Sequence, residues 1–423
     1  MQILRKPLVL ALTFSALPVS AVASEVEAGT VIEASTWEAL KDQTFEGHRI
    51  ADMVPPGLEV LVREYGLKLP LRHSGPLTFD PRGLKNTERY AGEVHYDPAT
   101  RLVSNYVAGV PFPDVQRDAL AVGDPETAAT KLMWNFFLAN PLFPDNYQIG
   151  GNEGAGIYHI DGSKGVERVQ GAIDYKYRMV ARMSEPHTLG DGSVYKKQIF
   201  MLTTPYDVRG VGGYTVRYMD GRPDDSYVYV KSVRRLRRVS GNTWMDPLGA
   251  GAFLNEDNFL MDIHPIWYPK YNLLGEATIL AVVHGYDTSP KGGVEKKYDL
   301  KSAPYWNPIG MEWEPRTVYV IEGTPPSFHL YGKKIWYMEK SAPFFHMNDI
   351  FDRQGKRWRV NIMYSHVTTP AESPIPTMAI SGISFIDLQQ NRASVVDAVG
   401  LRIGDPEITE ENYSPAAVLK LLR

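Results

Sequence analysis

A segment rich in arginine is the part of the sequence best suited to bind an anion. Residues 227–240 begin as an aromatic and β-branched stretch that includes Tyr229, and five cations then fall within residues 231–238. Because like charges this close repel one another, they need counter-charges. The arginines are Arg234, Arg235, Arg237 and Arg238, and the acidic residues that follow are Asp246, Glu256, Asp257 and Asp262. Two interpretations stay open: an ion-pair network that closes a sheet edge, or guanidinium groups that bind an anionic head group.

Aromatic side chains are concentrated just after this segment. They are Trp244, Phe253, Phe259, Trp267, Tyr268 and Tyr271, and Trp134, Phe136 and Phe137 add to them from an earlier stretch. They could form an ordinary core, or they could line an apolar cavity beneath a curled sheet. On the second hypothesis, the candidate ligand-binding residues are Trp134, Phe137, Tyr229, the four arginines, Trp244, Phe253, Trp267 and Tyr271.

Catalytic signatures are scarce in this sequence. It has no His-Glu-x-x-His, Gly-x-Ser-x-Gly or phosphate-binding Gly-Lys-Ser/Thr motif, and its lack of cysteine excludes thiolate chemistry. His346 and His366 could meet across neighbouring strands and bind a metal, although histidines with ordinary hydrogen-bond partners are the commoner case. Glu312 and Glu314 could act as a carboxylate pair, or they could lie on a solvated face. We expect no catalytic residue, metal or cofactor.

Charge and the N-terminal segment indicate where the protein works. The formal net charge of −4 argues against nucleic acid as a partner. Arg5 and Lys6 precede a short apolar run, and residues 21–23 form a small-x-small cleavage site. We therefore expect residues 1–23 to be a signal peptide and the remainder to be periplasmic, with peripheral association with the outer membrane left open. No later run reaches the ~20 apolar residues that a membrane span requires.

The elements that must position these residues are mostly strands. We predict helices within residues 30–75, over 124–139 and over 415–422, where Asp124 and Pro125 begin the second of them. The predicted strands are 88–96, 101–108, 175–183, 195–203, 317–322, 334–339, 344–351 and 356–364. Strands that follow one another without intervening helices favour antiparallel pairing.

The predicted fold class is therefore α+β and mainly antiparallel β. We expect an unclosed, curled β-barrel with helices packed on its concave face. Residues 24–423 should form one large domain, with a helix-rich part over 24–145 and a mostly β part with a C-terminal helix over 146–423.

Several motifs resemble a known family in the same order along the chain. They are residues 109–113 before Trp134-Asn135, residues 227–240 with Trp244-Met245-Asp246-Pro247, and residues 268–275, 316–323 and 351–358. Together they resemble the domain of unknown function 1329, which is often labelled an outer membrane lipoprotein-sorting protein.

This resemblance implies a fold similar to the LolA and LolB periplasmic carriers, with an apolar cavity for acyl chains and without an assigned enzymatic activity. It also implies as partners transporters of the resistance–nodulation–division type and outer-membrane proteins. The leading hypothesis is a non-catalytic binding and transfer protein for lipids or other hydrophobic molecules. The alternatives are an interaction subunit of an envelope transporter complex, and an envelope hydrolase or glycan-binding protein.

Overall fold

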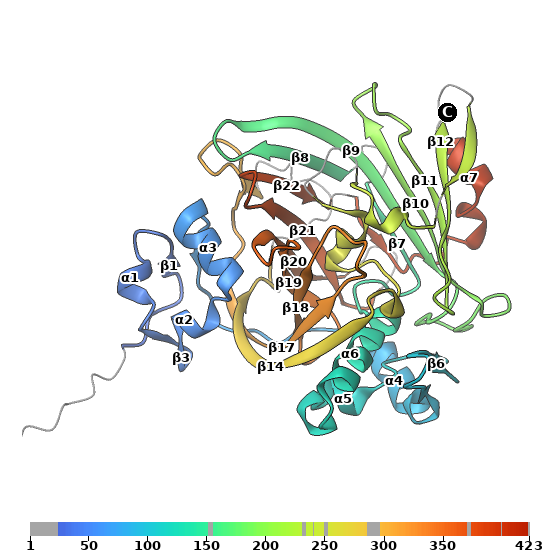
Figure 1. Cartoon of the computed structure of the whole chain (residues 1–423), viewed down its shortest axis with the longest axis horizontal. Helices are drawn as coiled ribbons and strands as arrows, with labels where there is room; N and C mark the ends of the chain where they lie inside the picture. Colours follow the sequence, from blue (N-terminus) through green and yellow to red (C-terminus); the bar gives the residue numbers. More distant parts are fainter. Residues whose placement is uncertain are drawn as a thin grey trace, which may run out of the picture.

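A large antiparallel sheet dominates the molecule (Figure 1). The computed structural model describes residues 24–150, 155–230, 234–239, 241–248, 253–285, 297–369, 374–398 and 400–421. The predicted signal peptide, residues 1–23, lies outside the described residues. Among the described residues, no helix has the length and apolar character needed to cross a membrane.

The large sheet contains fifteen strands. They are β7 (Asn146–Ile149), β8 (Ala155–Asp161), β9 (Gly165–Arg178), β10 (Val194–Thr204), β11 (Gly212–Tyr218), β12 (Asp225–Val230), β13 (Arg235–Val239), β14 (Lys270–Ala281), β17 (Glu314–Thr324), β18 (Lys333–Glu339), β19 (Phe345–Phe351), β20 (Arg357–Thr368), β21 (Thr377–Asp387), β22 (Arg392–Asp397) and β23 (Arg402–Ile403). Four further two-stranded pairs are β1 (Val31–Ile32) with β4 (Leu69–Pro70), β2 (Thr44–Phe45) with β3 (His48–Arg49), β5 (His95–Tyr96) with β6 (Val103–Ser104), and β15 (Tyr298–Asp299) with β16 (Asn307–Pro308).

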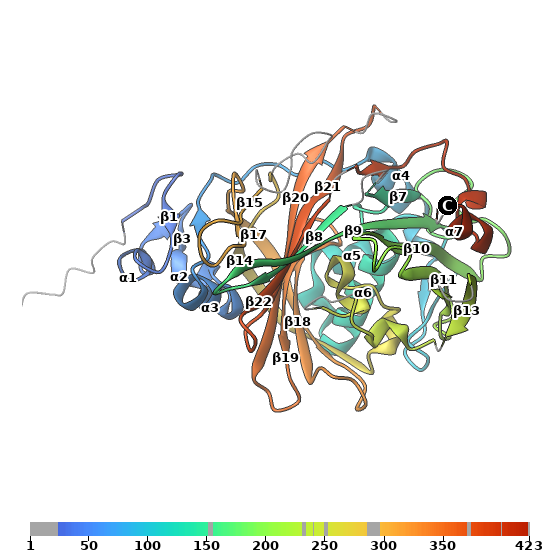
Figure 2. The same ribbon diagram turned by 90° about the horizontal axis from the view of Figure 1, so that it is seen from above.

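The sheet is open, because its strand order runs from β13 at one edge to β14 at the other. The full order is β13-β12-β11-β10-β9-β8-β22-β21-β20-β19-β18-β17-β14, with β7 and β23 attached beside β9. Each named pair of neighbours is antiparallel. The sheet curls around the chain segments on one of its faces (Figures 1 and 2). The predicted unclosed, curled antiparallel sheet is therefore confirmed.

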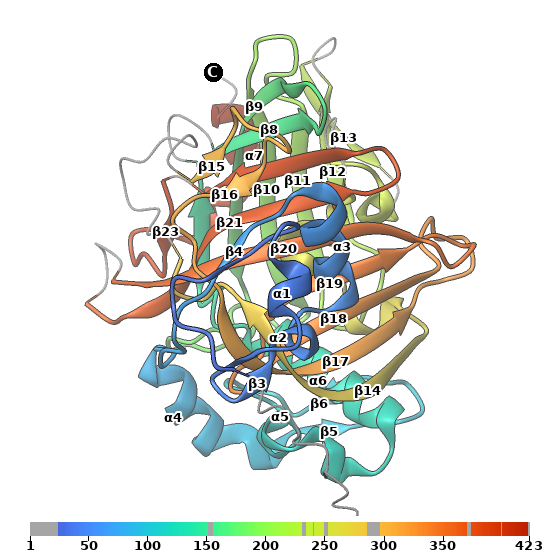
Figure 3. The same ribbon diagram turned by 90° about the vertical axis from the view of Figure 1, so that its left-hand side faces the viewer.

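The helices cover both faces of this sheet. They are α1 (Trp37–Leu40), α2 (Ile50–Met53), α3 (Pro56–Tyr65), α4 (Pro81–Tyr90), α5 (Pro113–Arg117), α6 (Pro125–Ala139) and α7 (Pro415–Leu421). Helix α6 lies on the concave face, as expected, whereas α1 to α3 cover the opposite face of β17 to β20 (Figure 3). Short 3-10 turns complete the chain: η1 (Ala91–Glu93), η2 (Ala119–Val122), η4 (Thr243–Met245), η5 (Asn255–Leu260), η6 (Pro265–Trp267) and η8 (Glu410–Asn412).

Helix α6 forms where the sequence predicts it. The Asp124 side chain accepts hydrogen bonds from the backbone N–H groups of Glu126 and Thr127, and Pro125 occupies the first turn. These contacts satisfy backbone N–H groups that have no partner within the helix at its first turn. The helix is buried on nearly all sides after its first turn, so it is a core element rather than a surface helix.

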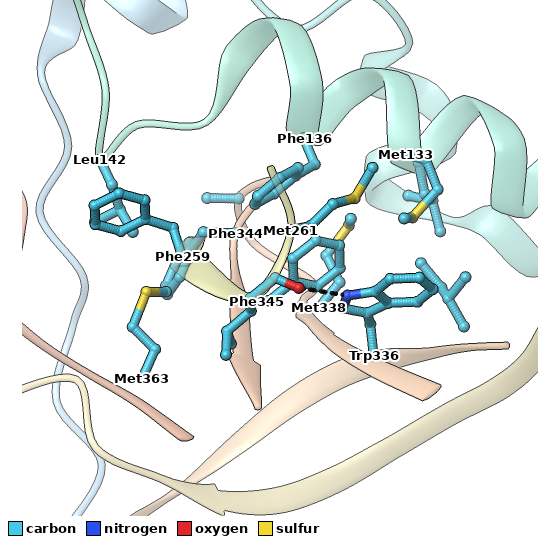
Figure 4. Packing of buried hydrophobic residues seen from close by; sticks show 14 of the residues in the cluster. Met133, Phe136, Leu142, Phe259, Met261, Trp336, Met338, Phe344, Phe345 and Met363 are labelled. Carbon is cyan, nitrogen blue, oxygen red and sulfur yellow. Dashed lines mark hydrogen bonds between the residues drawn. The ribbon is translucent and has the colours of Figure 1, made fainter. Parts of the chain in front are cut away.

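Successive side chains of a strand point to opposite faces of the sheet, and in these strands both faces carry apolar side chains. Toward α6, the side chains of Tyr319, Trp336, Met338 and Phe345 join one cluster, shown in part in Figure 4. Toward α1 to α3, the side chains of Val318, Tyr337, Met347, Val360 and Ile362 join another. Because both faces are buried, these strands do not show a polar side, and β21 is buried along its whole length.

One predicted hairpin is wrong in its extent. Strands were expected over 88–96 and 101–108, but residues up to Tyr90 belong to α4 and the strands β5 and β6 have two residues each. The turn between them is where the sequence places it, since Asp97 accepts hydrogen bonds from Ala99 and Thr100. The Asp80 side chain caps α4 by accepting a hydrogen bond from the Arg82 N–H. The strand prediction for residues 88–96 did not take this helix start into account.

Candidate functional site

A large groove opens where the helices meet the β14 edge of the sheet. It has a volume of about 1030 Å³ and lies between α4, the segment leading into α5, the end of α6 and the ends of β17 and β18. Its apolar lining comes from Phe79, Leu84, Val110, Leu138, Ala139, Phe143, Met183 and Ala342. Leu84 is 64% exposed, so the groove opens to solvent along α4.

A close backbone contact shapes the α4 wall of the groove. Thr87 of α4 accepts a hydrogen bond from the Val110 N–H at 2.9 Å and donates one to the Gly83 carbonyl at 2.8 Å. A β-carbon on Gly109 would lie 2.4 Å from the Thr87 nitrogen, and Gly109 has a φ of +80°. Only glycine fits such a position, because the backbone conformation and the available space both exclude a side chain. The Gly109-Val110 pair therefore brings α4 against the rest of the groove.

Buried amide side chains hold the other walls together. Asn135 of α6 accepts from the Phe112 N–H at 2.9 Å and donates to the Phe112 carbonyl at 3.0 Å. It also donates to Gln116 of α5 at 3.2 Å, and Gln116 donates to the carbonyl oxygens of Glu339 and Lys340. This chain of hydrogen bonds connects α6, α5 and the turn after β18, so the groove is part of the rigid fold.

The floor of the groove carries a buried ion-pair network. Arg316 of β17 donates to both carboxylate oxygens of Glu339, at 3.0 and 3.1 Å, and His346 lies 3.0 Å from the same carboxylate. Glu314 is fully buried beside Arg72, His284 and Arg316. Burial alone would raise the pKa of Glu339, but the hydrogen bonds and charges of His346 and Arg316 lower it to about 2. This carboxylate stays ionised and paired, so it is unsuited to act as an acid.

Two of the predicted aromatic residues, Phe253 and Phe137, pack closely against other rings. Phe253 stacks on Phe385 with ring centroids 3.9 Å apart, and Phe137 stacks on Tyr195 at 4.0 Å. Among the described residues, the spaces that Phe137 and Phe253 line are only about 50 and 40 Å³. Residues 259–263 and α6 pack on the concave face here (Figure 4). This packing favours the interpretation of an ordinary core, and an apolar cavity lined by these aromatics stays a prediction.

The other predicted aromatic residues are also packed against neighbours. Trp134 donates to the Arg101 carbonyl at 2.9 Å, and Tyr271 stacks on Tyr268. Trp244 stacks on Trp267 with ring centroids 5.6 Å apart, and Trp244 also borders a separate space of about 260 Å³. None of the predicted ligand-binding aromatics lines the large groove. Their role in ligand binding stays a prediction.

The arginine cluster lies at the other end of the sheet. Arg235, Arg237 and Arg238 belong to the edge strand β13, and Arg234 precedes it; all four are exposed. Tyr229 of β12 pairs with Leu236 in the same hairpin. The cluster is at the β13 edge, whereas the groove is lined by the other edge, β14, by β17 and β18, and by residues 178–183 at the end of β9. Charged side chains on an edge strand also discourage pairing with another chain.

The acidic residues that were expected to neutralise these arginines have other partners. Arg238 forms an ion pair with Asp225. Glu256 and Asp257 instead contact Lys334, at 2.9 and 2.7 Å. Asp262 pairs with Lys176, Lys196 and Arg217, and Asp246 is exposed. A buried carboxylate needs a partner that is buried with it, which the exposed arginines are not.

The other candidate groups for chemistry are separated. Glu312 is exposed whereas Glu314 is buried, so they do not form a pair. His346 contacts Glu339 and His366 contacts Ser381, although the strands that carry them are neighbours. Within the described residues, no group of three or more histidine, aspartate or glutamate side chains could hold a metal.

The residues that line the groove come from segments far apart in the sequence, and no single sequence motif contains them. The motif 109–113 was noted in the sequence and does form one wall, but its role becomes visible only when Thr87 and Asn135 are placed against it. The remaining walls come from residues 79–87, 138–144, 178–183, 315–317 and 339–343. Gly109, which precedes the Val-Pro-Phe-Pro run, is the residue in this motif whose type indicates a tight backbone contact.

Comparison with known proteins gives a family match. A family profile described as "Protein of unknown function (DUF1329)" matches residues 45–418. No curated protein matches the chain. A solved DUF1329 family protein from Desulfovibrio piger is 17% identical and has a TM-score of 0.47, with 70% of this chain and 99% of that chain covered.

Two further solved structures are similar at a lower level. A putative outer membrane lipoprotein-sorting protein domain from Vibrio parahaemolyticus is 13% identical, with a TM-score of 0.44 over 65% of this chain and 92% of that chain. A LolA superfamily protein from Nitrosomonas europaea is 13% identical, with a TM-score of 0.39 over 68% of this chain and 97% of that chain. Similarity at this level does not extend to function.

Proposed function

The chain belongs to the DUF1329 family, and we propose that it binds and transfers lipids or other hydrophobic molecules in the groove without catalysing a reaction. The observation that carries this proposal is the groove itself. Its volume of about 1030 Å³ lies just above the roughly 300–1,000 Å³ that is typical of small-molecule sites. Its apolar lining is open to solvent along α4, so an oily molecule could enter without the core unfolding.

The energetics of an acyl chain support a carrier of this kind. Each methylene costs about 0.8 kcal/mol to expose to water, so a chain of ~16 methylenes faces a barrier of roughly 13 kcal/mol in an aqueous compartment. A groove lined by Phe79, Leu84, Leu138 and Met183 removes much of that surface from water. Because apolar contact is non-directional, we expect the tail to be recognised weakly and the polar groups to select the ligand.

The charged groups around the groove support a binding role over a catalytic one. Arg316 and Glu339 are paired with each other, and Lys340 hydrogen-bonds Glu276. Groups that neutralise one another inside the fold stabilise its walls and leave little driving force for proton transfer. The proposal places the protein in the periplasm, on the predicted signal peptide, and includes an envelope transporter or outer-membrane protein as donor or acceptor.

Native mass spectrometry tests this function directly. Protein isolated from the periplasmic fraction without detergent should carry an amphiphile that is released on denaturation. After removal of that amphiphile, a fluorescent fatty acid should bind, and unlabelled hexadecanoate should displace it. Protein that is free of ligand and does not bind the fluorescent fatty acid would refute a carrier function.

A further inference from the structure

A small chamber lined by aromatic and charged side chains lies directly behind the groove. It has a volume of about 50 Å³ and is enclosed by the end of α6, by β9 and β10, and by residues 259–263. Asn140, Phe143 and Arg178 line both the groove and the chamber. The chamber is large enough for a few waters or one small anionic group, since a water needs about 10–15 Å³. Because these three residues border both spaces, the chamber and the groove are neighbours.

Cations outnumber carboxylates around this chamber. Lys176, Lys196 and Arg178 line it together with one carboxylate, Asp262. Asp262 hydrogen-bonds both lysines and Arg217, which also pairs with Asp224. Asp174 lies 3.8 Å from Lys176. When all four basic side chains in and around the chamber are protonated, they exceed these three carboxylates by one charge.

Arg178 carries that excess, because it contacts carbonyl groups. Its guanidinium donates to the carbonyl oxygens of Leu138 at 2.6 Å and Ala181 at 3.1 Å. A longer contact of 3.5 Å joins its Nη2 atom to the Asn140 carbonyl. These contacts engage only part of the guanidinium and do not neutralise its charge. Lys176 also lies 4.1 Å from the centre of the Phe259 ring, which attracts a cation but adds no negative charge.

An unused hydrogen-bond donor points to an acceptor in the same place. The Asn140 side chain is buried, at 3% exposed, and its Oδ1 atom accepts from the Leu142 N–H at 3.0 Å. Its Nδ2 atom has no hydrogen-bond partner among the described residues. A buried amide donor without an acceptor is unfavourable, so this position favours a bound acceptor atom.

We propose that the chamber is an anion subsite in which Asn140, Arg178, Lys176 and Lys196 hold an acidic head group, or a free inorganic anion, behind the apolar groove. Binding of a head group in the chamber rests on the proposed function. In that case, an acidic amphiphile such as a fatty acid is the preferred ligand. The apolar tail would then lie in the groove, and the acid group would enter past Asn140 and Phe143.

The lowered pKa of Lys196 agrees with a chamber that has too little negative charge to keep this lysine protonated. Burial, together with the nearby charges of Lys176 and Arg217, lowers the pKa of Lys196 to about 7 against the opposing attraction of Asp262. A bound anion would favour the charged form of Lys196 and raise this pKa.

Substitution Asn140→Asp tests the subsite with little change in shape. The new carboxylate keeps an oxygen for the Leu142 N–H and is surrounded by cations, so the fold should persist. The matched control is Asn105→Asp, which adds the same charge at an exposed position outside both spaces. Binding of hexadecanoate and of hexadecanol is measured by displacement of a fluorescent probe from wild type and both variants.

Wild type and Asn105→Asp should prefer hexadecanoate over hexadecanol, and Asn140→Asp should lower that preference by about tenfold or more. Equal preference in all three proteins would overturn the anion subsite and leave the carrier function standing. Failure of both compounds to bind wild type would instead refute the carrier function.

A crystal soaked in sodium bromide distinguishes the two sources of the anion. An anomalous bromide peak in the chamber that hexadecanoate abolishes assigns the site to the head group. A bromide peak that persists beside bound hexadecanoate assigns it to a free inorganic anion. A chamber that holds neither bromide nor the carboxylate would overturn the proposal.

Discussion

Asp349 of β19 contacts Gly57 of α3 so closely that a β-carbon on Gly57 would lie 1.8 Å from the Asp349 Oδ1 atom. This contact is where the N-terminal helices meet the sheet face opposite to α6. Asp349 is buried, and its only described ion-pair partner is Arg357, at 3.5 Å. Packing at this interface therefore depends on the absence of a side chain at residue 57.

The first prediction concerns Gly57→Ala. Replacing a helical glycine by alanine usually stabilises a protein by about 0.5–1 kcal/mol. Here the added methyl group meets a buried carboxylate, so we expect the substitution to lower the free energy of unfolding by about 1–3 kcal/mol. Gly83→Ala in α4 is the control, because its β-carbon would lie 3.6 Å from the Met183 Cε atom, an ordinary contact. Urea denaturation that finds Gly57→Ala as stable as wild type would contradict this account.

The second prediction concerns pH. Burial raises the pKa of Asp349 from 3.8 to about 6, against the opposing attraction of Arg357. Since the folded protein holds this proton more tightly than the unfolded chain, the carboxyl stabilises the fold at low pH, and this stability is lost as the pH rises through about 6. Asp349→Asn removes the titration. Relative to wild type, the variant should gain about 2 kcal/mol of unfolding free energy between pH 4 and pH 7.

Urea denaturation of both proteins across that pH range measures the difference, in which titrations common to both cancel. An unchanged difference between pH 4 and pH 7 would show that Asp349 is ionised in the folded protein throughout.

The third prediction compares two adjacent lysines of β18. Lys334 is buried and contacts Glu256 and Asp257 at 2.9 and 2.7 Å. Lys334→Met leaves two buried carboxylates without this cation and should cost about 3–5 kcal/mol. Lys333 points to the other face, where its pair with Glu322 is partly exposed, so Lys333→Met should change stability by about 0–1 kcal/mol. Equal losses in urea denaturation at pH 7 would mean that the buried network does not stabilise the fold.

The sequence predicts the elements whose causes are local. Asp124, Pro125 and the Asn140-Pro141 pair specify both ends of α6, and consecutive strand patterns predict the antiparallel run from β17 to β20. These features depend on neighbouring residues, so they can be recognised without knowing what the chain packs against.

The position of the groove could not be predicted in this way. Aromatic composition indicates that Phe253 and Phe137 are buried, but it cannot indicate that Phe253 stacks on Phe385 or that Phe137 stacks on Tyr195. The groove depends on contacts between distant residues, such as Gly109 with Thr87 and Gln116 with the Glu339 carbonyl. Such contacts depend on how the whole chain folds, and a motif of neighbouring residues carries no information about them.

The fourth prediction tests whether the apolar wall of the groove binds the ligand. Leu84 lines the groove and is 64% exposed, so Leu84→Asp should leave the fold intact while placing a charge beside the ligand tail. We expect fluorescent fatty acid to bind at least about tenfold more weakly, because a charge in an apolar site must lose its hydration when the tail enters. Leu120→Asp is the matched control, since Leu120 is 54% exposed and lies outside the groove lining. If both variants bind the probe as wild type does, the tail does not contact the α4 wall; if both lose binding equally, the added charge rather than its position is responsible.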